Sequence, residues 1–226
     1  MPSITQNLSE VRESVAAAAR AVGRDPASVK LLAVSKTFPS EAVLEAYGVG
    51  QRLFGENHAQ EIEAKAAILP KDIEWHFIGH LQGNKVGRVV EVAAWIHSVD
   101  STRLLDRIDL LAGERGRCPN ILLEVNISGE ETKHGLRPAG VLELARSALA
   151  KSHLRLGGLM TMAPYGAPRE QLEGIFSGLR ELRGEIERKL GVSLPELSMG
   201  MSGDYPEAIA QGATIVRVGS AIFGTR

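Results

Sequence analysis

The feature that most constrains the fold is an alternation of two kinds of segment along most of the chain. Short apolar or β-branched runs, typical of buried strands, alternate about eight times with longer amphipathic stretches of helical periodicity. A strand followed by a helix, repeated about eight times, is the order of a (β/α)8 barrel. We therefore predict a TIM-type barrel, preceded by an extra helix from about Ile4 to Val22. The expected strands cover residues 31–35, 53–57, 75–79, 95–100, 121–126, 156–162, 196–201 and 214–219.

A doubly wound open sheet is the alternative arrangement of such segments. It needs fewer repeats and a glycine-rich turn after its first strand, whereas the turn here reads SKTFPS. The chain has 226 residues, slightly fewer than the roughly 250 typical of a barrel. No linker or low-complexity segment divides it, so we predict a single domain over residues 1–226.

Composition excludes several classes of function. Lys and Arg total 26 and Asp and Glu total 27, a net charge of −1, so no global positive field favours nucleic acid. No apolar run approaches the roughly 20 residues of a membrane span, and the first residues do not resemble a signal peptide. The single cysteine, Cys118, allows no internal disulfide. We expect a cytoplasmic protein that binds neither nucleic acid nor membranes.

Lys36 directly follows the first predicted strand. Because strand side chains alternate, Leu32, Val34 and Lys36 share one face, and Lys36 stands at the barrel mouth if that face points inward. Desolvation there would favour the neutral amine, the form that condenses with an aldehyde. The alternative is a solvated lysine at a strand end.

Arg217 lies inside the last apolar run, between Val216 and Val218. A charged group in such a run is paired or faces a ligand. Its alternation places it with Ile215 and Gly219. The two interpretations are a ligand contact and a structural ion pair with a carboxylate of the barrel.

Small residues follow the last two predicted strands. Barrels frequently bind phosphate between these loops, where backbone N–H groups converge on helix starts. We predict a phosphate cradle there, with two ordinary tight turns as the alternative, and we predict that Asp204 caps the helix that runs through Ala210. The predicted cradle consists of Gly200, Ser202, Gly219 and Ser220.

Other polar residues at strand ends are less informative. His76 and His80 lie too far apart on an extended strand to share one small ion, and we assign no metal ligand. Asn57 and Asn126 could each bind a ligand ring or cap a loop. A reactive lysine, a phosphate cradle and a buried arginine together suit an aldehyde that carries a phosphate. Pyridoxal 5′-phosphate fits this description.

Several segments, in this order, resemble the pyridoxal phosphate homeostasis protein family, which is similar to the barrel domain of alanine racemase. The resemblance extends from about Lys30 to Gly224, and small departures such as His80 leave it intact. The segments are LLAVSKTFPSEAV, FGENHAQE, WHFIGHLQGNK, EVNISGEETKHGL, GLMTMAP, LSMGMSGDYPEAI and RVGSAIFG.

The resemblance implies that Lys36 holds the cofactor as an internal aldimine and that Arg217 faces the pyridine nitrogen. It places Asn57 beside the ring and the last two loops on the phosphate. The full predicted cofactor-binding set is Lys36, Asn57, Met199, Gly200, Ser202, Arg217, Gly219 and Ser220.

A guanidinium stays protonated and opposes protonation of the pyridine nitrogen, which weakens the ring as an electron sink. Racemases of the alanine racemase family add a second base, a tyrosine from an extra domain of the partner subunit, for which this chain has no residues left. Of the three tyrosines only Tyr165 could reach the site. We therefore predict a carrier of pyridoxal phosphate with little or no catalysis, monomeric, with PLP-dependent apoenzymes and amino acids as further candidate partners. A small amino-acid racemase and a lysine-dependent aldolase are the alternatives.

Overall fold

The computed structural model describes residues 3–130 and 133–224. Residues 1–2 and 225–226 of the predicted domain, and Glu131 and Thr132 of the EVNISGEETKHGL segment, lie outside them. The described strands form a closed parallel barrel in sequential order, as the alternation predicts. It is closed by β8 and β1, which pair from Lys30 with Ile215 to Ala33 with Val218. The strands are β1 Lys30–Val34, β2 Leu53–Glu56, β3 Glu74–Phe77, β4 Trp95–Val99, β5 Asn120–Glu124, β6 Arg155–Met160, β7 Glu196–Met201 and β8 Ile215–Val218.

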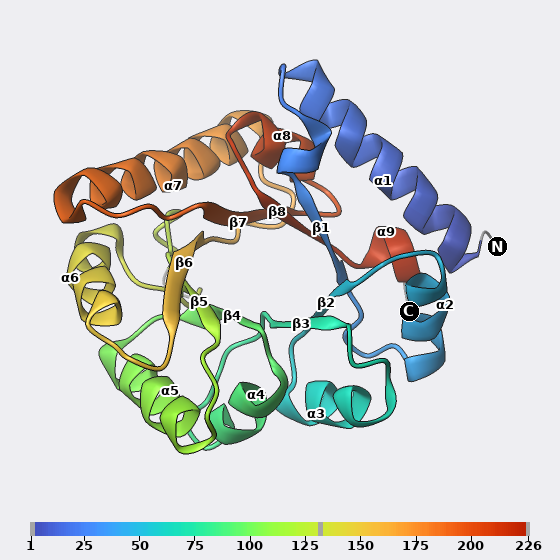
Figure 1. Ribbon diagram of the computed structural model, residues 1–226. Helices are drawn as coiled ribbons and strands as arrows, with labels where there is room; N and C mark the ends of the chain where they lie inside the picture. Colours follow the sequence, from blue (N-terminus) through green and yellow to red (C-terminus); the bar gives the residue numbers. More distant parts are fainter. Residues whose placement is uncertain (1–2, 131–132, 225–226) are drawn as a thin grey trace.

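The helices surround the barrel, and Figure 1 looks along its axis. Apolar side chains between the barrel and the helices form the main hydrophobic core. Among the described residues, no helix has both the length and the apolar character that crossing a membrane requires. The helices are α1 Ile4–Ala21, α2 Ser40–Gly48, α3 Ala59–Ile68, α4 Val86–Val92, α5 Thr102–Glu114, α6 Pro138–Leu149, α7 Arg169–Leu190, α8 Tyr205–Ala210 and α9 Ser220–Phe223, with a short 3-10 turn at Pro26–Ser28.

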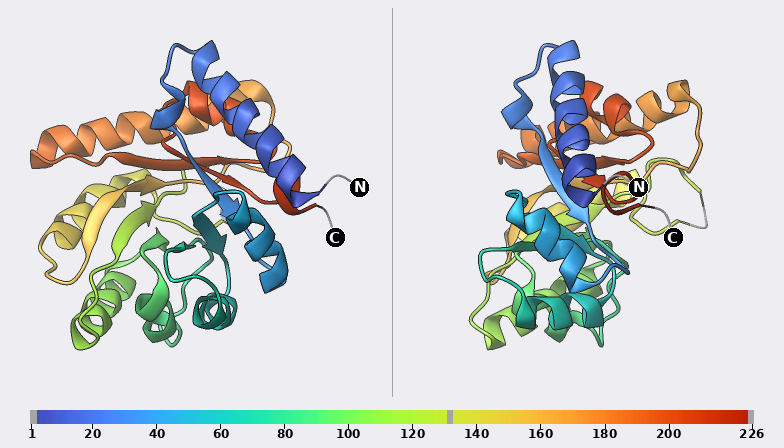
Figure 2. Two further views of the ribbon diagram at one scale, coloured as in Figure 1. Left: turned by 45° about the vertical axis from the view of Figure 1, so that its right-hand side comes forward. Right: turned by 90° about the vertical axis from the view of Figure 1, so that its right-hand side faces the viewer.

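The extra N-terminal helix α1 is present as predicted. Ser3 caps it and forms a capping box with Gln6. Its buried stripe packs over α8 and α9, and Figure 2 shows α1 lying along this side of the barrel. Each fully buried valine or leucine of such a stripe contributes about 1.5–3 kcal/mol. The stripe consists of Leu8, Val11, Val15 and Ala19.

Hydrogen bonds that cross the barrel identify the side chains that point inward. His97 on β4 bonds Ser198 on β7, and these strands do not pair with each other. Arg217 bonds the same Ser198, and Leu32 is the register partner of Arg217 on β1. Leu32 and Val34 therefore face the interior, as the alternation predicts, and Lys36 follows them at the carboxyl end of the strand.

Candidate functional site

A cavity of about 530 Å³ opens at the carboxyl ends of the strands, where barrels carry their sites. Six of the eight residues of the predicted set line it. They are Lys36, Asn57, Ser202, Arg217, Gly219 and Ser220. Segments far apart in the sequence thus contribute to one cavity, because the closed barrel brings β8 beside β1.

The turn that carries Lys36 has an unusual backbone conformation. The next residue, Thr37, has a φ of +68°, a left-handed conformation that costs a non-glycine residue roughly 1–2 kcal/mol. The carboxylate of Glu61 on α3 accepts a hydrogen bond from the Thr37 N–H at 2.7 Å and so holds the turn. Lys36 itself is exposed, so the desolvation expected from the sequence is not found in this structure.

A buried polar cluster holds the backbone directly before the same turn. Lys65 on α3 donates to the carbonyl of Ser35 at 2.8 Å and to the carboxylate of Glu56 at 2.6 Å. The Ser35 hydroxyl donates to the same carboxylate oxygen at 2.7 Å. Burial raises the pKa of Glu56 to about 7, although the Lys65 ammonium opposes this shift. This cluster was not predicted from the sequence; the available signal was a glutamate at the end of the run LFGE, where apolar side chains are expected.

Arg217 is buried within the barrel and faces neutral partners. Its Nη1 donates to Ser198 Oγ at 2.6 Å, and its Nη2 donates to the carbonyl of Thr161 at 2.9 Å. No ion pair to its guanidinium occurs within the described residues, so the predicted alternative of a structural ion pair is not found. Burial lowers its pKa to about 10, and the nearby Asp204 and Glu124 oppose this shift. The guanidinium therefore remains charged at neutral pH.

A chain of hydrogen bonds continues from Arg217 across the barrel. Ser198 Oγ lies 3.0 Å from His97 Nδ1, His97 Nε2 lies 2.9 Å from His76 Nδ1, and His76 Nε2 lies 3.0 Å from the carboxylate of Glu74. Burial lowers the pKa of both histidines, so both are neutral at pH 7.

One assignment of protons satisfies this whole chain. The guanidinium can only donate and the ionised Glu74 can only accept, so every bond points from Arg217 towards Glu74. Ser198 then donates to His97, and each imidazole carries its proton on Nε2. His97 and Ser198 were not predicted from the sequence, because no local sequence signal indicates that they meet.

The loops after β7 and β8 line one side of the cavity. Ser202, Gly203, Gly219 and Ser220 all contribute to its wall. α9 begins at Ser220, and the first N–H groups of a helix have no intrahelical acceptor. Hydroxyls, glycines and free N–H groups together form a suitable phosphate site.

Two residues of the predicted cofactor-binding set do not line the cavity. Met199 is fully buried in the core between barrel and helices, with its side chain among apolar groups. Gly200 has a φ of +91°, and a Cβ there would lie 2.6 Å from the Cβ of Ala208. Their assignment as cofactor-binding residues stays a prediction, and the lack of a side chain at Gly200 allows the close packing of α8. Asp204 is the N-cap residue of α8, as predicted, but its carboxylate accepts from the Met201 N–H and makes no hydrogen bond to the first turn of the helix.

The two asparagines predicted at strand ends, Asn57 and Asn126, have different roles. Asn57 Oδ1 is buried without a hydrogen-bond partner, and Asn57 lines the cavity. An unpaired buried acceptor of this kind indicates a ligand donor or water. Asn126 instead organises its own loop, donating to the carbonyl of Glu130 at 2.8 Å and accepting from the Gly129 N–H at 2.9 Å. The loop-capping interpretation is correct for Asn126.

Comparison with known proteins agrees with this geometry. The family described as "Alanine racemase, N-terminal domain" matches residues 6–226. Pyridoxal phosphate homeostasis proteins of Aquifex aeolicus and Pseudomonas aeruginosa are 43% and 44% identical, covering 98% and 100% of this chain and 97% of each relative. The structure of PipY of Synechococcus elongatus with PLP bound has a TM-score of 0.87 at 40% identity and covers 98% of this chain and 100% of that one. The chain therefore belongs to the pyridoxal phosphate homeostasis protein family, built on the fold of the alanine racemase N-terminal domain.

Proposed function

We propose that this protein binds pyridoxal 5′-phosphate in the cavity that Lys36 and Arg217 line, and that it serves cofactor homeostasis as a carrier with little or no catalysis. The observation that carries the proposal is the meeting of an amine, a buried guanidinium and a wall of hydroxyls and glycines in one cavity. The relative PipY, 40% identical, has a structure with PLP bound.

The donor set fits each part of this cofactor. Lys36 supplies the amine for the aldehyde, and the wall of Ser202, Gly203, Gly219 and Ser220 supplies hydroxyl and N–H donors for the phosphate. The unpaired Oδ1 of Asn57 can accept a hydrogen bond from a polar ring substituent. When bound, pyridoxal phosphate supplies an aldehyde that reacts with amines and a ring that withdraws electrons.

Arg217 limits the chemistry that the site can support. It is buried and charged at neutral pH, and its Nη1 and Nη2 already donate to Ser198 and Thr161. A group that keeps its proton cannot transfer it to a ring nitrogen, and its charge opposes protonation there. This arrangement disfavours reactions that need a strong electron sink.

The tyrosines also argue against an efficient racemase, which needs bases on both faces of the cofactor. Tyr47 donates to Asp72 at 2.7 Å on the outside of the barrel, and Tyr205 is hydrogen-bonded to Ser14 of α1 at 2.7 Å. Tyr165 lines the cavity but is fully exposed, an environment that does not favour a fixed catalytic position. An exposed Lys36 suits uptake and release of a cofactor better than sequestered catalysis.

We propose PLP-dependent apoenzymes as recipients of the cofactor. The exposed lysine can release the cofactor to them by exchange with another amine. Free amino acids would enter the same exchange. A monomer is proposed, because Lys36 and Arg217 come from one chain and the cavity is built without a partner. Localisation in the cytoplasm stays a prediction.

The experiment that tests the site is borohydride reduction of the PLP-loaded protein, followed by tryptic mapping. We expect loss of the visible absorption band and added mass on Lys36, which blocks cleavage and yields a joined peptide of residues 31–52. Lys36→Ala should give no added mass and retain the urea midpoint of unfolding, because it removes an exposed side chain. Lys189→Ala, an exposed lysine on α7, is the matched control. Added mass on another lysine in the wild type would refute the assignment.

Two assays then distinguish a cofactor carrier from an enzyme. Loaded protein should reactivate a PLP-dependent apoenzyme faster than spontaneous dissociation of the cofactor allows, and L-alanine should keep its optical activity. Loss of optical activity that depends on Lys36 and Tyr165 would favour a racemase. Trapping of a carbonyl substrate by borohydride without cofactor would favour an aldolase.

A further inference from the structure

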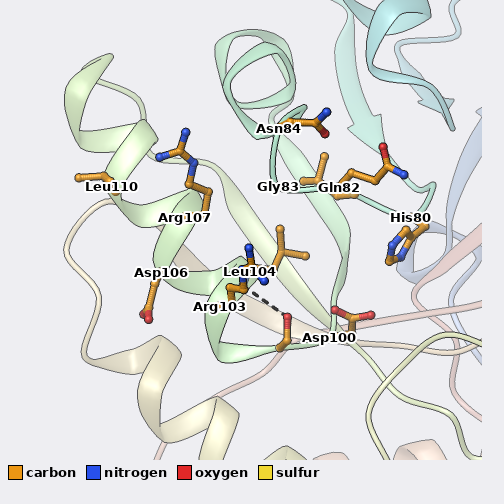
Figure 3. A pocket seen from close by; sticks show the side chains of 12 residues that line it. His80, Gln82, Gly83, Asn84, Asp100, Arg103, Leu104, Asp106, Arg107 and Leu110 are labelled. Carbon is orange, nitrogen blue, oxygen red and sulfur yellow. Dashed lines mark hydrogen bonds between the residues drawn. The ribbon is translucent and has the colours of Figure 1, made fainter.

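A second cavity, of about 810 Å³, lies beside the mouth of the barrel between the β3–α4 and β4–α5 connections. Figure 3 shows His80 and Asp100 close together at one edge of it, with α5 and its Arg103 and Arg107 along another wall. None of these residues lines the cavity that contains Lys36. The second cavity is therefore separate from the candidate cofactor site.

Three metal-binding side chains meet at the edge of this second cavity. His80 follows β3, Asp100 follows β4 directly, and His134 lies in the loop between β5 and α6. One ligand atom from each lies within 4.8 Å of the other two. The two imidazole rings stack, with centroids 4.1 Å apart and planes 15° apart.

The backbone on either side of these residues is anchored. The preceding Gly79 packs so closely on the carbonyl of Asn57 that a Cβ would lie 2.2 Å from it, which fixes the start of the loop carrying His80. Leu136, two residues after His134, exchanges backbone hydrogen bonds with β5 and with Asn126, at 2.8 and 2.9 Å. The two histidines are thus presented from anchored segments, and Asp100 directly follows β4.

The side chains themselves have free polar atoms. Within residues 3–130 and 133–224, neither imidazole nor the Asp100 carboxylate forms a hydrogen bond or ion pair with a protein group. By contrast, His76 and His97 inside the barrel are fully engaged. We propose that His80, Asp100 and His134 form a binding site for a divalent transition-metal ion of the zinc class.

The ligand types select this class of metal. Imidazole suits Zn²⁺, Co²⁺, Ni²⁺ and Cu²⁺, whereas Mg²⁺ and Ca²⁺ require oxygen ligands. Tetrahedral zinc with bonds of about 2.0–2.2 Å separates its ligands by about 3.4 Å. The three ligand atoms lie within 4.8 Å of one another, so metal binding would require the two exposed imidazoles to rotate about their side-chain bonds towards the spacing of zinc ligands. With three protein ligands, a fourth position stays open to water or to an anion.

The charge around the site is compatible with a bound cation. Asp100 supplies one negative charge to the metal, and the neighbouring Lys133 is neutralised by Glu130 at 3.0 Å. Arg103 and Arg107 lie on the α5 wall of the cavity, so they favour an anionic fourth ligand. No metal ligand was predicted from the sequence, because His76 and His80 lie too far apart on an extended strand; the structure instead brings His80 to Asp100 and His134.

The proposal is tested by titrating the full-length protein with Zn²⁺ in a calorimeter and with Co²⁺ in a spectrophotometer, both with and without bound PLP. A Cys118→Ser background removes the exposed thiol as a competing ligand. We expect one Zn²⁺ per chain and visible Co²⁺ ligand-field bands in both forms. His80→Ala, Asp100→Asn and His134→Ala should each weaken binding at least about tenfold, since loss of even an outer-shell partner costs about 10–100-fold.

His153→Ala is the matched control, because His153 is another exposed histidine near a carboxylate, 3.6 Å from Asp109, but outside the cluster. It should bind Zn²⁺ as the parent does. The urea midpoints of the variants verify that each is folded. Absence of stoichiometric Zn²⁺ binding, or unchanged binding after loss of either His80 or His134, would overturn the proposal.

Discussion

Glu124 is an ionisable group that the barrel holds at a cost to its stability. Its side chain on β5 is only 3% exposed. Burial, aided by the charge of Asp100, raises its pKa from 4.5 to about 7, although Arg217 opposes this shift. In the unfolded chain the same carboxyl ionises with its ordinary pKa. Between these two values the folded protein therefore binds more protons than the unfolded chain does, and its stability falls as pH rises.

The substitution Glu124→Gln removes this titration while keeping the shape of the side chain. A shift from 4.5 to about 7 corresponds to about 3 kcal/mol of stability, present below pH 4.5 and lost once pH exceeds 7. We therefore expect Glu124→Gln to be more stable than wild type by up to about 3 kcal/mol at pH 8. At pH 5 the expected difference is below about 1 kcal/mol.

Urea unfolding of the cofactor-free protein, followed by circular dichroism in buffer with a chelator, measures both differences. Burial also raises the pKa of Glu56 to about 7. Because Glu56 is present in both proteins, its contribution to the pH dependence cancels in the stability difference. Glu143→Gln, at an exposed position of α6, is the control and should show no pH-dependent difference. A Glu124→Gln variant that is less stable than wild type at pH 8, or a difference that does not change with pH, would refute the reasoning.

Two further substitutions test the packing around the site, each by urea unfolding. Lys65→Met leaves the buried Glu56 carboxylate without its cation and should cost about 3–5 kcal/mol, whereas Lys189→Met breaks an exposed pair and should cost less than about 1 kcal/mol. Equal losses of stability in the two variants would show that the buried ion pair contributes no more than the exposed one. Gly200→Ala places a Cβ 2.6 Å from Ala208 at a φ of +91° and should cost about 1–3 kcal/mol. Gly184→Ala, in open space on α7, should be neutral or stabilising, and the same result for Gly200→Ala would contradict the packing argument.

The barrel and the position of Lys36 could both be predicted from the amino-acid sequence. Strand and helix periodicities are local properties, so each expected run coincides closely with an observed strand. The alternation of Leu32, Val34 and Lys36 placed the lysine at the mouth for the same reason. Arg217 was recognisable because a charge within an apolar run needs a partner.

Alternation stopped being a reliable guide where the strands are irregular. The register of β7 against β8 shifts between Ser198 and Met201. Which residues beyond Ser198 line the cavity therefore could not be derived from the sequence pattern, and Met199 and Gly200 lie outside its lining.

Contacts between side chains that are distant in the sequence depend on the tertiary fold. Ser198 joins His97 to Arg217 across the interior, Glu56 meets Lys65 beneath the Lys36 turn, and His80 meets His134 outside. Sequence periodicity specifies the face on which a side chain lies but carries no information about the residue opposite it. Closure of the barrel, which brings non-neighbouring strands within hydrogen-bond distance, supplies that information.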